Sequence, residues 1–265
     1  MFWPKAAILD IIETFKDLPL VGMLGWQDVR HRYKRSSVGP FWLTASMGIM
    51  IATMGMIFGK IFHTPLKEFL PFLAVGIILW GFISTATTEA CASFALSAPL
   101  IKQHSLPLFL YVARVLWRNM LVLVHNIAIF PIVLLCVGKM PSWEMVLCIP
   151  GFLLFLLNFA WLSLMLGILC ARYRDLIQLI NSLMQIIFYA TPIMWMPDKL
   201  SQGSLGAYLV NFNPLYHLIS LVRTPLLGGL PTATNWEVSL ILALFGWTAS
   251  LLVYARCRNR IAYWL

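Results

Sequence analysis

Residues 144–172 read EMVLCIPGFLLFLLNFAWLSLMLGILCAR, with charged side chains only at the two ends. The 27 residues between Glu144 and Arg172 carry no charge. About 20 apolar residues are enough for a helix to cross the hydrocarbon core of a bilayer, whereas one charge at the bilayer centre costs about 2.5–3.5 kcal/mol on insertion scales. A window of this kind therefore predicts a membrane-spanning helix.

Five more windows without charges lie on either side of this one, and they hold 24, 20, 20, 22 and 18 residues in chain order. Together the six windows predict an all-α integral membrane protein with six transmembrane helices. The predicted spans are residues 41–59, 69–88, 119–137, 146–170, 176–196 and 238–254. In this prediction residues 1–35 form an N-terminal cytoplasmic segment and residues 36–265 form the transmembrane domain.

The composition also indicates a membrane protein. Hydrophobic residues make up 60% of the chain and charged residues 11%, against about 45–50% and about 25% in soluble domains, and the mean hydropathy is +0.83. These values exclude a disordered chain, a soluble globular enzyme and a coiled coil. The five cysteines are irregularly spaced, so they predict neither a disulfide framework nor a metal site.

The net charge of +9 is explained by membrane topology. Of the 19 Lys and Arg residues, 14 lie on one side of the predicted spans and 5 on the other. The positive-inside rule places the richer side, with both termini, in the cytoplasm. No nucleic acid partner is needed to account for the charge.

An amphipathic helix is predicted before the first span. Its apolar stripe consists of Ile8, Ile11, Ile12, Phe15 and Leu18, and Lys5, Asp10, Glu13 and Asp17 lie off that stripe. Such a helix fits the surface of a membrane, and it also fits the groove of a partner protein.

A basic cluster, residues 30–35 (RHRYKR), stands directly before the first span. Anchoring on the cytoplasmic side explains it without any further role. A second hypothesis assigns Arg30, Arg32, Lys34 and Arg35 to anionic lipid headgroups or a lipid pyrophosphate, since each such residue contributes about 1 kcal/mol toward an anionic surface. The two roles are compatible.

Two of the predicted spans carry side chains that need an explanation. Asn181, Gln185 and Tyr189 fall near one face of the fifth span, where polar groups either line a water-filled path or hydrogen-bond to neighbouring helices. We name them as candidate channel-lining residues. Small residues recur on the first span, and they predict close helix packing within the chain or between two copies; they are Gly48, Ala52, Gly55 and Gly59.

Two segments outside the six spans are also unusual. The window from Leu200 to Val222 has no charge but holds Asn211, Asn213 and Pro214 near its middle. Because buried backbone must be hydrogen-bonded internally in lipid, we predict two short segments, about 198–210 and 214–227, that dip into or lie on the membrane. The cytoplasmic loop 92–113 contains a short element between two prolines, which is either a docking element or a plain connector.

The chain contains no GxxxxGK[ST], HExxH or GxSxG motif and no charge inside a predicted span. Ion-coupled transporters place charged residues there, so active transport by this chain would draw its energy from a partner. Two other classes stay open. One is a membrane-embedded enzyme acting on a lipid-linked sugar, with Glu89, Asp175 and His217 as its candidate residues, and the other is a passive channel.

Several motifs follow one another in a recognisable order. Residues 26–42 read WQDVRHRYKRSSVGPFW, residues 99–107 read PLIKQHSLP and residues 171–176 read ARYRDL; TPI at 191–193 and NPL at 213–215 follow. In this order they resemble the motifs of polysaccharide-export ABC permeases, whose first span is approached through R-D-x-x-x-R-Y-[KR]-x-S-x-L-G-P-x-W. Gln27 stands where that family often has a basic residue, and His104-Ser105-Leu106-Pro107 replaces its usual Phe-Pro.

The resemblance implies a homodimer of six-helix subunits in the bacterial cytoplasmic (inner) membrane, with two separate ATPase subunits that bind ATP and Mg. This chain would then bind no cofactor and catalyse no reaction of its own. The cargo would be an undecaprenyl-linked or other lipid-linked polysaccharide such as O-antigen, with capsular polysaccharide or teichoic acid as alternatives. The N-terminal helix would be the interface helix, and residues 198–227 would form two external gate helices. The ATPase-coupling residues would be Leu100, Ile101, Lys102, Gln103, His104, Ser105 and Leu106.

Overall fold

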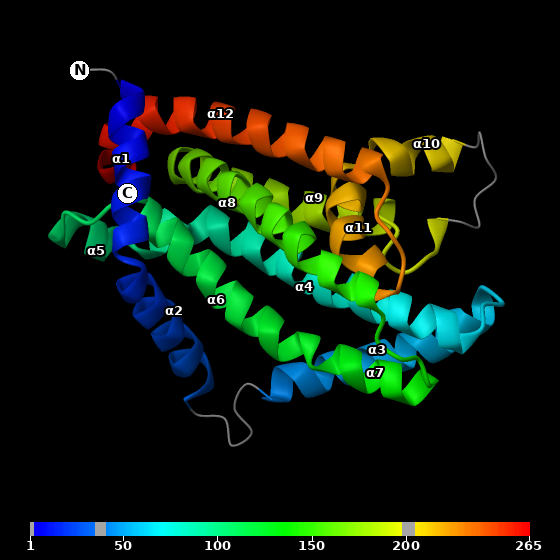
Figure 1. The fold of residues 1–265 in the computed structure, drawn as a ribbon. Helices are drawn as coiled ribbons and strands as arrows, with labels where there is room; N and C mark the ends of the chain where they lie inside the picture. Colours follow the sequence, from blue (N-terminus) through cyan, green and yellow to red (C-terminus); the bar gives the residue numbers. More distant parts are fainter. Residues whose placement is uncertain (1–2, 35–40, 198–204) are drawn as a thin grey trace.

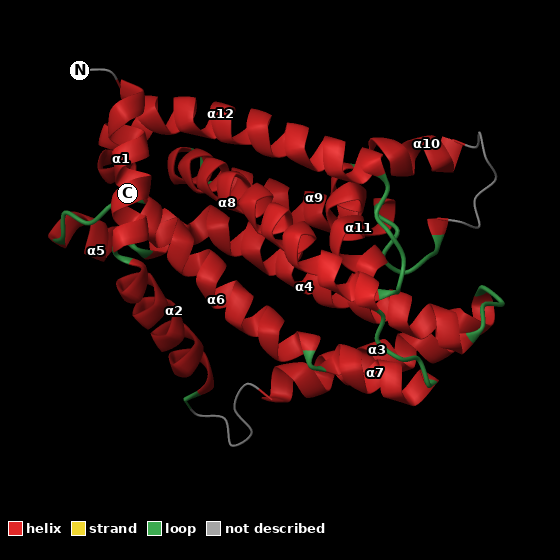
Figure 2. Ribbon diagram, in the orientation of Figure 1, coloured by secondary structure: helices red, strands yellow, loops and turns green. Residues whose placement is uncertain are grey.

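The computed structural model describes residues 3–34, 41–197 and 205–265. Within these ranges every regular element is a helix (Figure 2), as predicted. The helices are α1 (Trp3–Lys16), α2 (Leu18–Tyr33), α3 (Phe41–Ile61), α4 (Leu66–Leu96), α5 (Ala98–Gln103), α6 (Phe109–Ile127), α7 (Ile129–Val137), η1 (Trp143–Leu147), α8 (Cys148–Arg172), α9 (Leu176–Ala190), α10 (Leu205–Phe212), α11 (Pro214–Leu226) and α12 (Ala233–Trp264).

Five helical stretches of the described chain are long and apolar enough to cross a membrane. Each contains or closely overlaps one of the predicted spans, and four of them extend several residues further at one or both ends. The stretches are 41–61, 66–103, 109–137, 143–172 and 233–264. The charge-free windows therefore located five spans correctly, although they understated the length of the helices.

The fifth predicted span, 176–196, is wrong at its C-terminal end. The helix α9 stops at Ala190 because Pro192 has no N–H to donate and disfavours helical geometry at the residue before it, and Thr191 is extended with ψ 135°. At 1.5 Å per residue the 15 residues of α9 cover about 22 Å, less than the roughly 30 Å of a hydrocarbon core. The structure thus supports five long spans and one shorter apolar helix.

A proline also interrupts the third long stretch. The helix α6 ends at Ile127 and α7 begins at Ile129. Pro131 cannot donate the helical hydrogen bond to the carbonyl of Ile127, and its ring crowds that turn. The predicted span 119–137 is therefore two helices joined end to end.

The helix α4 is the centre of the molecule and contacts α3, α6, α7, α8, α9 and α11. Its buried residues form one apolar core with α6, α8 and α11. Phe82 of α4 packs against Phe155 and Phe159 of α8, with ring centroids 5.6 and 5.7 Å away. A second cluster joins α1, α2, α6, α8 and α12.

The two ends of the bundle differ in what they carry. Figure 1 shows α1, α5 and the C-terminus together at one end, with α10 at the opposite end. By the sequence prediction, the first end is the cytoplasmic one. The short element predicted between Pro99 and Pro107 is the helix α5, and it projects from this end.

Most of the apolar stripe of α1 is exposed, and of its residues Ile11 packs against the second cluster. Ile8, Ile12 and Phe15 are exposed, whereas Ala7, Asp10 and Thr14 are buried against the rest of the protein. The helix therefore packs through Ile11 and the residues beside the stripe, and the exposed stripe residues are available to a membrane surface or a partner. Asp10 lies off the stripe, as predicted, but it faces the protein interior.

The small residues of α3 divide into two groups. A side chain at Gly55 would collide with Leu70 of α4, and Gly59 lies under Leu66 and Phe69, so these two glycines serve packing within the chain. Among the described residues, no atom outside the backbone of its own helix and its chain neighbours lies within 4 Å of the position that a Cβ of Gly48 would take. The close packing predicted from the small residues is thus intrachain at the C-terminal half of α3.

Two short helices, α10 and α11, occupy the window predicted to hold two short segments. The first segment, 198–210, lies partly outside the described residues, and its described part is the start of α10. The second agrees with α11. Asn213 caps α11 by accepting a hydrogen bond from the Leu215 N–H at 3.0 Å, and its amide donates to Thr191 Oγ1 at 2.9 Å. The TPI and NPL motifs therefore meet in space.

Candidate functional site

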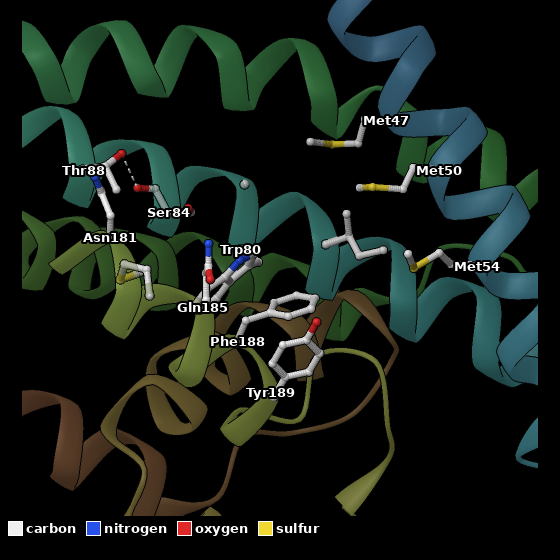
Figure 3. Close-up of a pocket in the computed structure, with 13 residues that line it drawn as sticks. Met47, Met50, Met54, Trp80, Ser84, Thr88, Asn181, Gln185, Phe188 and Tyr189 are labelled. Carbon is white, nitrogen blue, oxygen red and sulfur yellow. Dashed lines mark hydrogen bonds between the residues drawn. The ribbon is translucent and has the colours of Figure 1, made fainter. Parts of the chain in front are cut away.

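A cavity of about 630 Å³ opens between α3, α4 and α9 (Figure 3). The helix α4 forms its floor through residues 77–88, including Trp80, and the other two helices form facing walls. Its size lies within the range of about 300–1,000 Å³ that is typical of ligand pockets. The space between the three helices is thus large enough for a small molecule or for part of a larger ligand.

The two walls of this cavity have different chemistry. The α3 wall presents Met47, Met50 and Met54, flexible thioethers that adapt to apolar partners of irregular shape. The α9 wall presents the amides of Asn181 and Gln185 together with aromatic rings. The cavity therefore offers an apolar side and a side that can form hydrogen bonds.

Three aromatic rings adjoin the amides. The Trp80 ring lies 5.3 Å from that of Phe188, and the Phe188 ring lies 5.3 Å from that of Tyr189. Both pairs have the tilted or edge-to-face geometry that aromatic rings prefer. Flat apolar rings beside hydrogen-bonding amides suit a ligand that has both C–H faces and hydroxyl groups.

All three candidate channel-lining residues, Asn181, Gln185 and Tyr189, line this one cavity. That they line a path for a transported molecule remains a prediction. The methionine wall was not predicted. Its sequence signal is the spacing of Met47, Met50 and Met54, which places them on one face of α3.

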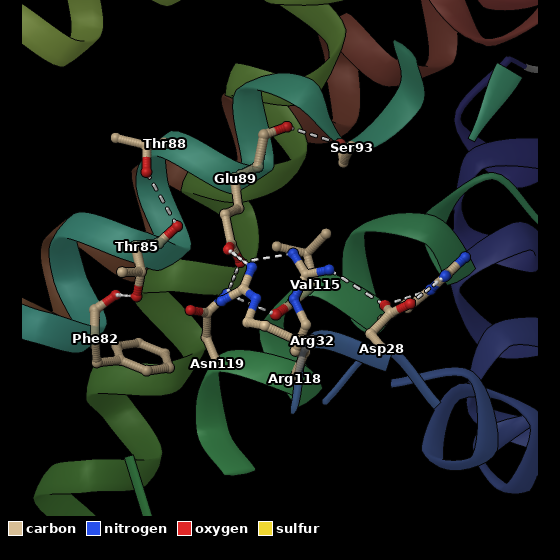
Figure 4. A network of polar contacts seen from close by, with 12 residues as sticks. Asp28, Arg32, Phe82, Thr85, Thr88, Glu89, Ser93, Val115, Arg118 and Asn119 are labelled. Atoms are coloured by element: carbon tan, nitrogen blue, oxygen red, sulfur yellow. Dashed lines mark hydrogen bonds and ion pairs between the residues drawn. The ribbon is translucent and has the colours of Figure 1, made fainter. Parts of the chain in front are cut away.

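A polar network stands near the end of α4 that leads into α5 (Figure 4). Glu89 Oε1 accepts from Arg32 Nη2 of α2 at 2.7 Å, and Glu89 Oε2 accepts from Arg118 Nη2 at 2.6 Å and Asn119 Nδ2 at 2.7 Å, both of α6. One carboxylate thus joins three helices. Sequence reasoning singled out Glu89 only as a candidate of the enzyme hypothesis and did not predict this role.

The network continues to α2 through a second carboxylate. Asp28 Oδ2 accepts from Arg114 Nε at 2.8 Å and from Arg118 Nη1 at 3.2 Å. Arg114 and Arg118 are four residues apart and so lie on one face of α6. Asp28 and Arg32 of the WQDVRHRYKR motif are likewise four residues apart, which explains how one face of α2 meets both α4 and α6.

The basic cluster before the first span is not uniform. Arg30 and Lys34 are exposed, while Arg32 is paired with Glu89. Arg35 lies outside the described residues. Four residues were assigned to lipid headgroups. Of these, Arg30 and Lys34 are exposed and do not bind Glu89 or Asp28 in the described structure.

The three enzyme candidates have different neighbours. Glu89 belongs to the network above, and Asp175 precedes α9. His217 is buried in α11, with Nδ1 2.8 Å from Asn235 Oδ1 and Nε2 2.8 Å from the Asn211 carbonyl oxygen. The structure does not bring the three residues together as one catalytic group.

A second buried polar residue holds α11. Arg223 Nη1 donates to the Pro192 carbonyl at 2.6 Å, and its guanidinium carbon stands 4.0 Å from the centroid of the Phe72 ring. Arg223 thus fixes the turn after α9 to α11 and α4. In the sequence Arg223 is one of the five basic residues on the predicted external side, and its role here was not predicted.

The candidate coupling residues fall into two sets. Leu100, Ile101 and Leu106 pack against the second apolar cluster, which joins α1, α6 and α12. The others point away from the protein and are exposed: Lys102, Gln103, His104 and Ser105. The first set holds the loop on the membrane domain, and the second is accessible to another protein.

Comparison with known proteins fits this architecture. Residues 19–227 match the family described as ABC-2 type transporter, and the chain therefore belongs to that family and is a multi-pass membrane permease. It is similar to an O-antigen export system permease protein RfbA of Klebsiella pneumoniae, with 24% identity over 221 residues, which cover 83% of each chain.

Two further relatives carry the same description. A second RfbA of Klebsiella pneumoniae is 24% identical over 242 residues, covering 89% of this chain and 90% of the relative. The RfbA of Myxococcus xanthus is 21% identical over 209 residues, covering 78% and 80%. The similarity thus extends over most of both chains in each case.

Proposed function

We propose that this chain is the membrane-spanning subunit of an ATP-driven exporter that moves a lipid-linked polysaccharide such as O-antigen across the bacterial cytoplasmic membrane. Two copies of the chain would work with two copies of a separate ATPase subunit, and both termini would face the cytoplasm. The observation that carries the proposal is the similarity to O-antigen export permeases over 78–89% of the chain.

The α5 loop supports the coupling part of the proposal. Its exposed residues 102–105 project from the end of the bundle that carries α1 and the C-terminus. Its apolar residues connect it to the core cluster of the membrane domain. A displacement of the exposed tip by an ATPase would therefore be transmitted to α6 and α12.

The cavity supports the cargo part of the proposal. Sugar hydroxyls would hydrogen-bond to Asn181 and Gln185, sugar C–H faces would stack on the rings of Trp80 and Tyr189, and an apolar chain would contact the methionines of α3. Arg30 and Lys34 would meet the pyrophosphate of the lipid carrier at the cytoplasmic surface. Full retention of pyrophosphate-lipid binding by the double variant Arg30→Gln, Lys34→Gln would exclude that last role.

The test is removal of the chain from a bacterium that depends on it. We expect the surface polysaccharide to be lost and its lipid-linked form to accumulate on the cytoplasmic side, with both defects reversed by the wild-type chain. Inactivation of the partner ATPase should give the same two defects. Undiminished surface polysaccharide without internal accumulation would contradict the proposal, and the structure of the accumulated glycan would distinguish O-antigen from capsule and teichoic acid.

A further inference from the structure

A buried carboxylate lies where α1 meets the start of α6 and the end of α12. Asp10 is 1% exposed. Its Oδ1 accepts from the Leu108 N–H at 3.2 Å and pairs with Arg258 Nη2 at 2.8 Å, and its Oδ2 accepts from the Phe109 N–H at 3.0 Å and from the Tyr254 hydroxyl at 2.6 Å. Each carboxylate oxygen therefore has two donors.

Two of these bonds make Asp10 the N-terminal cap of α6. The first N–H groups of a helix have no partner inside the helix, and the cap position of α6 is Leu108, whose side chain forms no capping hydrogen bond. Asp10 supplies the missing acceptor from a point 98 residues earlier in the chain. Its negative charge is also favourable beside a helix N-terminus.

The cap lies next to the coupling loop. Only residues 104–108 separate α5 from α6. Leu100 and Leu106 of the loop pack against the same cluster that contains Ala7 of α1 and Tyr254 of α12. A movement of α5 that displaced the first turn of α6 would therefore either carry α1 and α12 with it or break the bonds of Asp10.

We propose that Asp10 is a positioning residue that makes α1, the start of α6 and the end of α12 move as one unit when the ATPase displaces α5. This inference rests on the proposed function, since it assumes that the loop receives a movement from an ATPase. It goes beyond that function because it names the residue through which the movement reaches both α1 and α12.

The acceptor requirement at this site is strict. In Asp10→Asn one oxygen becomes an NH₂ group that faces donors, so at least one N–H or the Arg258 guanidinium is left without its acceptor. Tyr254→Phe is the milder variant, because it removes a single hydroxyl and leaves the cap of α6 and the ion pair intact.

The experiment uses the full complex of the chain with its ATPase in lipid bilayers and measures the amount of glycan delivered per ATP hydrolysed. We expect Asp10→Asn and Tyr254→Phe to assemble and to hydrolyse ATP while this ratio falls several-fold, more in Asp10→Asn. Two controls should keep the wild-type ratio. Asp17→Asn makes the same change at an exposed residue that follows α1. Asn158→Leu removes the hydrogen bonds that Asn158 donates to the carbonyls of Ser239 on α12 and Leu154 on α8, together with the acceptor of the Trp161 indole N–H.

A distance measurement separates transmission from a merely structural role. Spin labels at Ile12→Cys on α1 and Tyr263→Cys on α12, both exposed in the structure, in a background without the native cysteines, should keep one distance in the resting and vanadate-trapped states. In Asp10→Asn the trapped state should show a changed or broadened distance. The inference is overturned if the distance between the labels stays the same in both states of Asp10→Asn. It is also overturned if that distance changes between the two states when Asp10 is present.

The outcomes also separate this inference from the proposed function. A wild-type complex that delivers no glycan on hydrolysis contradicts the proposed function. Two outcomes with an active wild-type complex contradict only the role of Asp10. In the first, Asp10→Asn and Tyr254→Phe both keep the wild-type amount of glycan per ATP. In the second, Asn158→Leu lowers that amount as much as they do. If Asp10→Asn does not assemble, Tyr254→Phe decides on the same criteria.

Discussion

Glu89 shows how one side chain can join three helices at a membrane surface. It receives two guanidinium groups and an amide from α2 and α6, and its side chain is 21% exposed. Removing one member of a partly buried charge cluster leaves the others without their counter-charge, which is more destabilising than the net contribution of the pair. The stability of this region should therefore depend strongly on Glu89.

We expect Glu89→Gln to destabilise the protein by about 1–3 kcal/mol, because the amide cannot neutralise Arg32 and Arg118. Thermal unfolding of the purified chain in detergent measures the effect. Glu13→Gln is the matched control, since Glu13 is an exposed residue of α1 and its replacement should be within about 0.5 kcal/mol of neutral. Equal melting temperatures for the two variants would show that the network contributes nothing to stability.

The same residue explains why sequence reasoning missed the network. In the sequence Glu89 is a lone carboxylate at the end of a span, and its partners Arg32 and Arg118 stand 57 and 29 residues away. Periodicity shows which residues share a face of one helix, but it does not show which face of another helix lies opposite. The positive-inside rule accounted for Arg118 by topology, and Arg32 was assigned to topology or to lipid headgroups, so neither arginine was expected to pair with Glu89.

At the scale of elements, Asn213 links two turns that the sequence presents as separate motifs. Its carbonyl oxygen caps α11 and its amide holds Thr191 after α9. An N-terminal cap contributes about 1 kcal/mol. The position of α11 relative to α9 therefore depends on both the oxygen and the nitrogen of the Asn213 side-chain amide.

Two substitutions separate these roles. Asn213→Asp keeps the cap and loses the hydrogen bond donated to Thr191, whereas Asn213→Ala loses both. We therefore expect the amides of α11 to exchange more slowly in Asn213→Asp than in Asn213→Ala. Hydrogen exchange of the amides of α11 gives the readout, with an increase of about fivefold for the loss of 1 kcal/mol. Identical exchange in both variants would mean that the cap does not stabilise α11.

The helices themselves were predictable to different degrees for physical reasons. Five spans could be located because exclusion of charge from the bilayer acts on each segment separately. The end of α9 was misplaced because Pro192 stops the helix even where the next residues are uncharged. Asp10 was correctly placed off the apolar stripe of α1, but its burial depends on Tyr254, 244 residues away, which no local pattern reveals.

At the scale of the whole molecule, the cavity between α3, α4 and α9 is the feature that a transport path would use. All three polar candidates of α9 line it. Hydrogen bonding to neighbouring helices is the other explanation for polar groups at that place. The two explanations differ in whether water reaches these side chains during turnover.

In a background without native cysteines, we expect Asn181→Cys, Gln185→Cys and Tyr189→Cys to react with a water-soluble thiol reagent during ATP turnover, at least tenfold faster than Leu244→Cys. Leu244 is an exposed apolar residue of α12, where lipid would exclude the reagent. Mass spectrometry of the modified peptides measures the rates. Absence of labelling at all three cavity positions during turnover would favour helix packing over a path.

The site of Asp10 has a consequence for how the protein is made. Asp10 is synthesised 244 residues before Tyr254, and synthesis runs from the N-terminus; Arg258 follows Tyr254. Until α12 has been inserted, the carboxylate lacks two of its four donors, and α1 cannot dock without burying a charge that is only partly compensated. Final docking of α1 thus waits for insertion of α12, so that a chain in which α12 is missing or misinserted leaves α1 undocked.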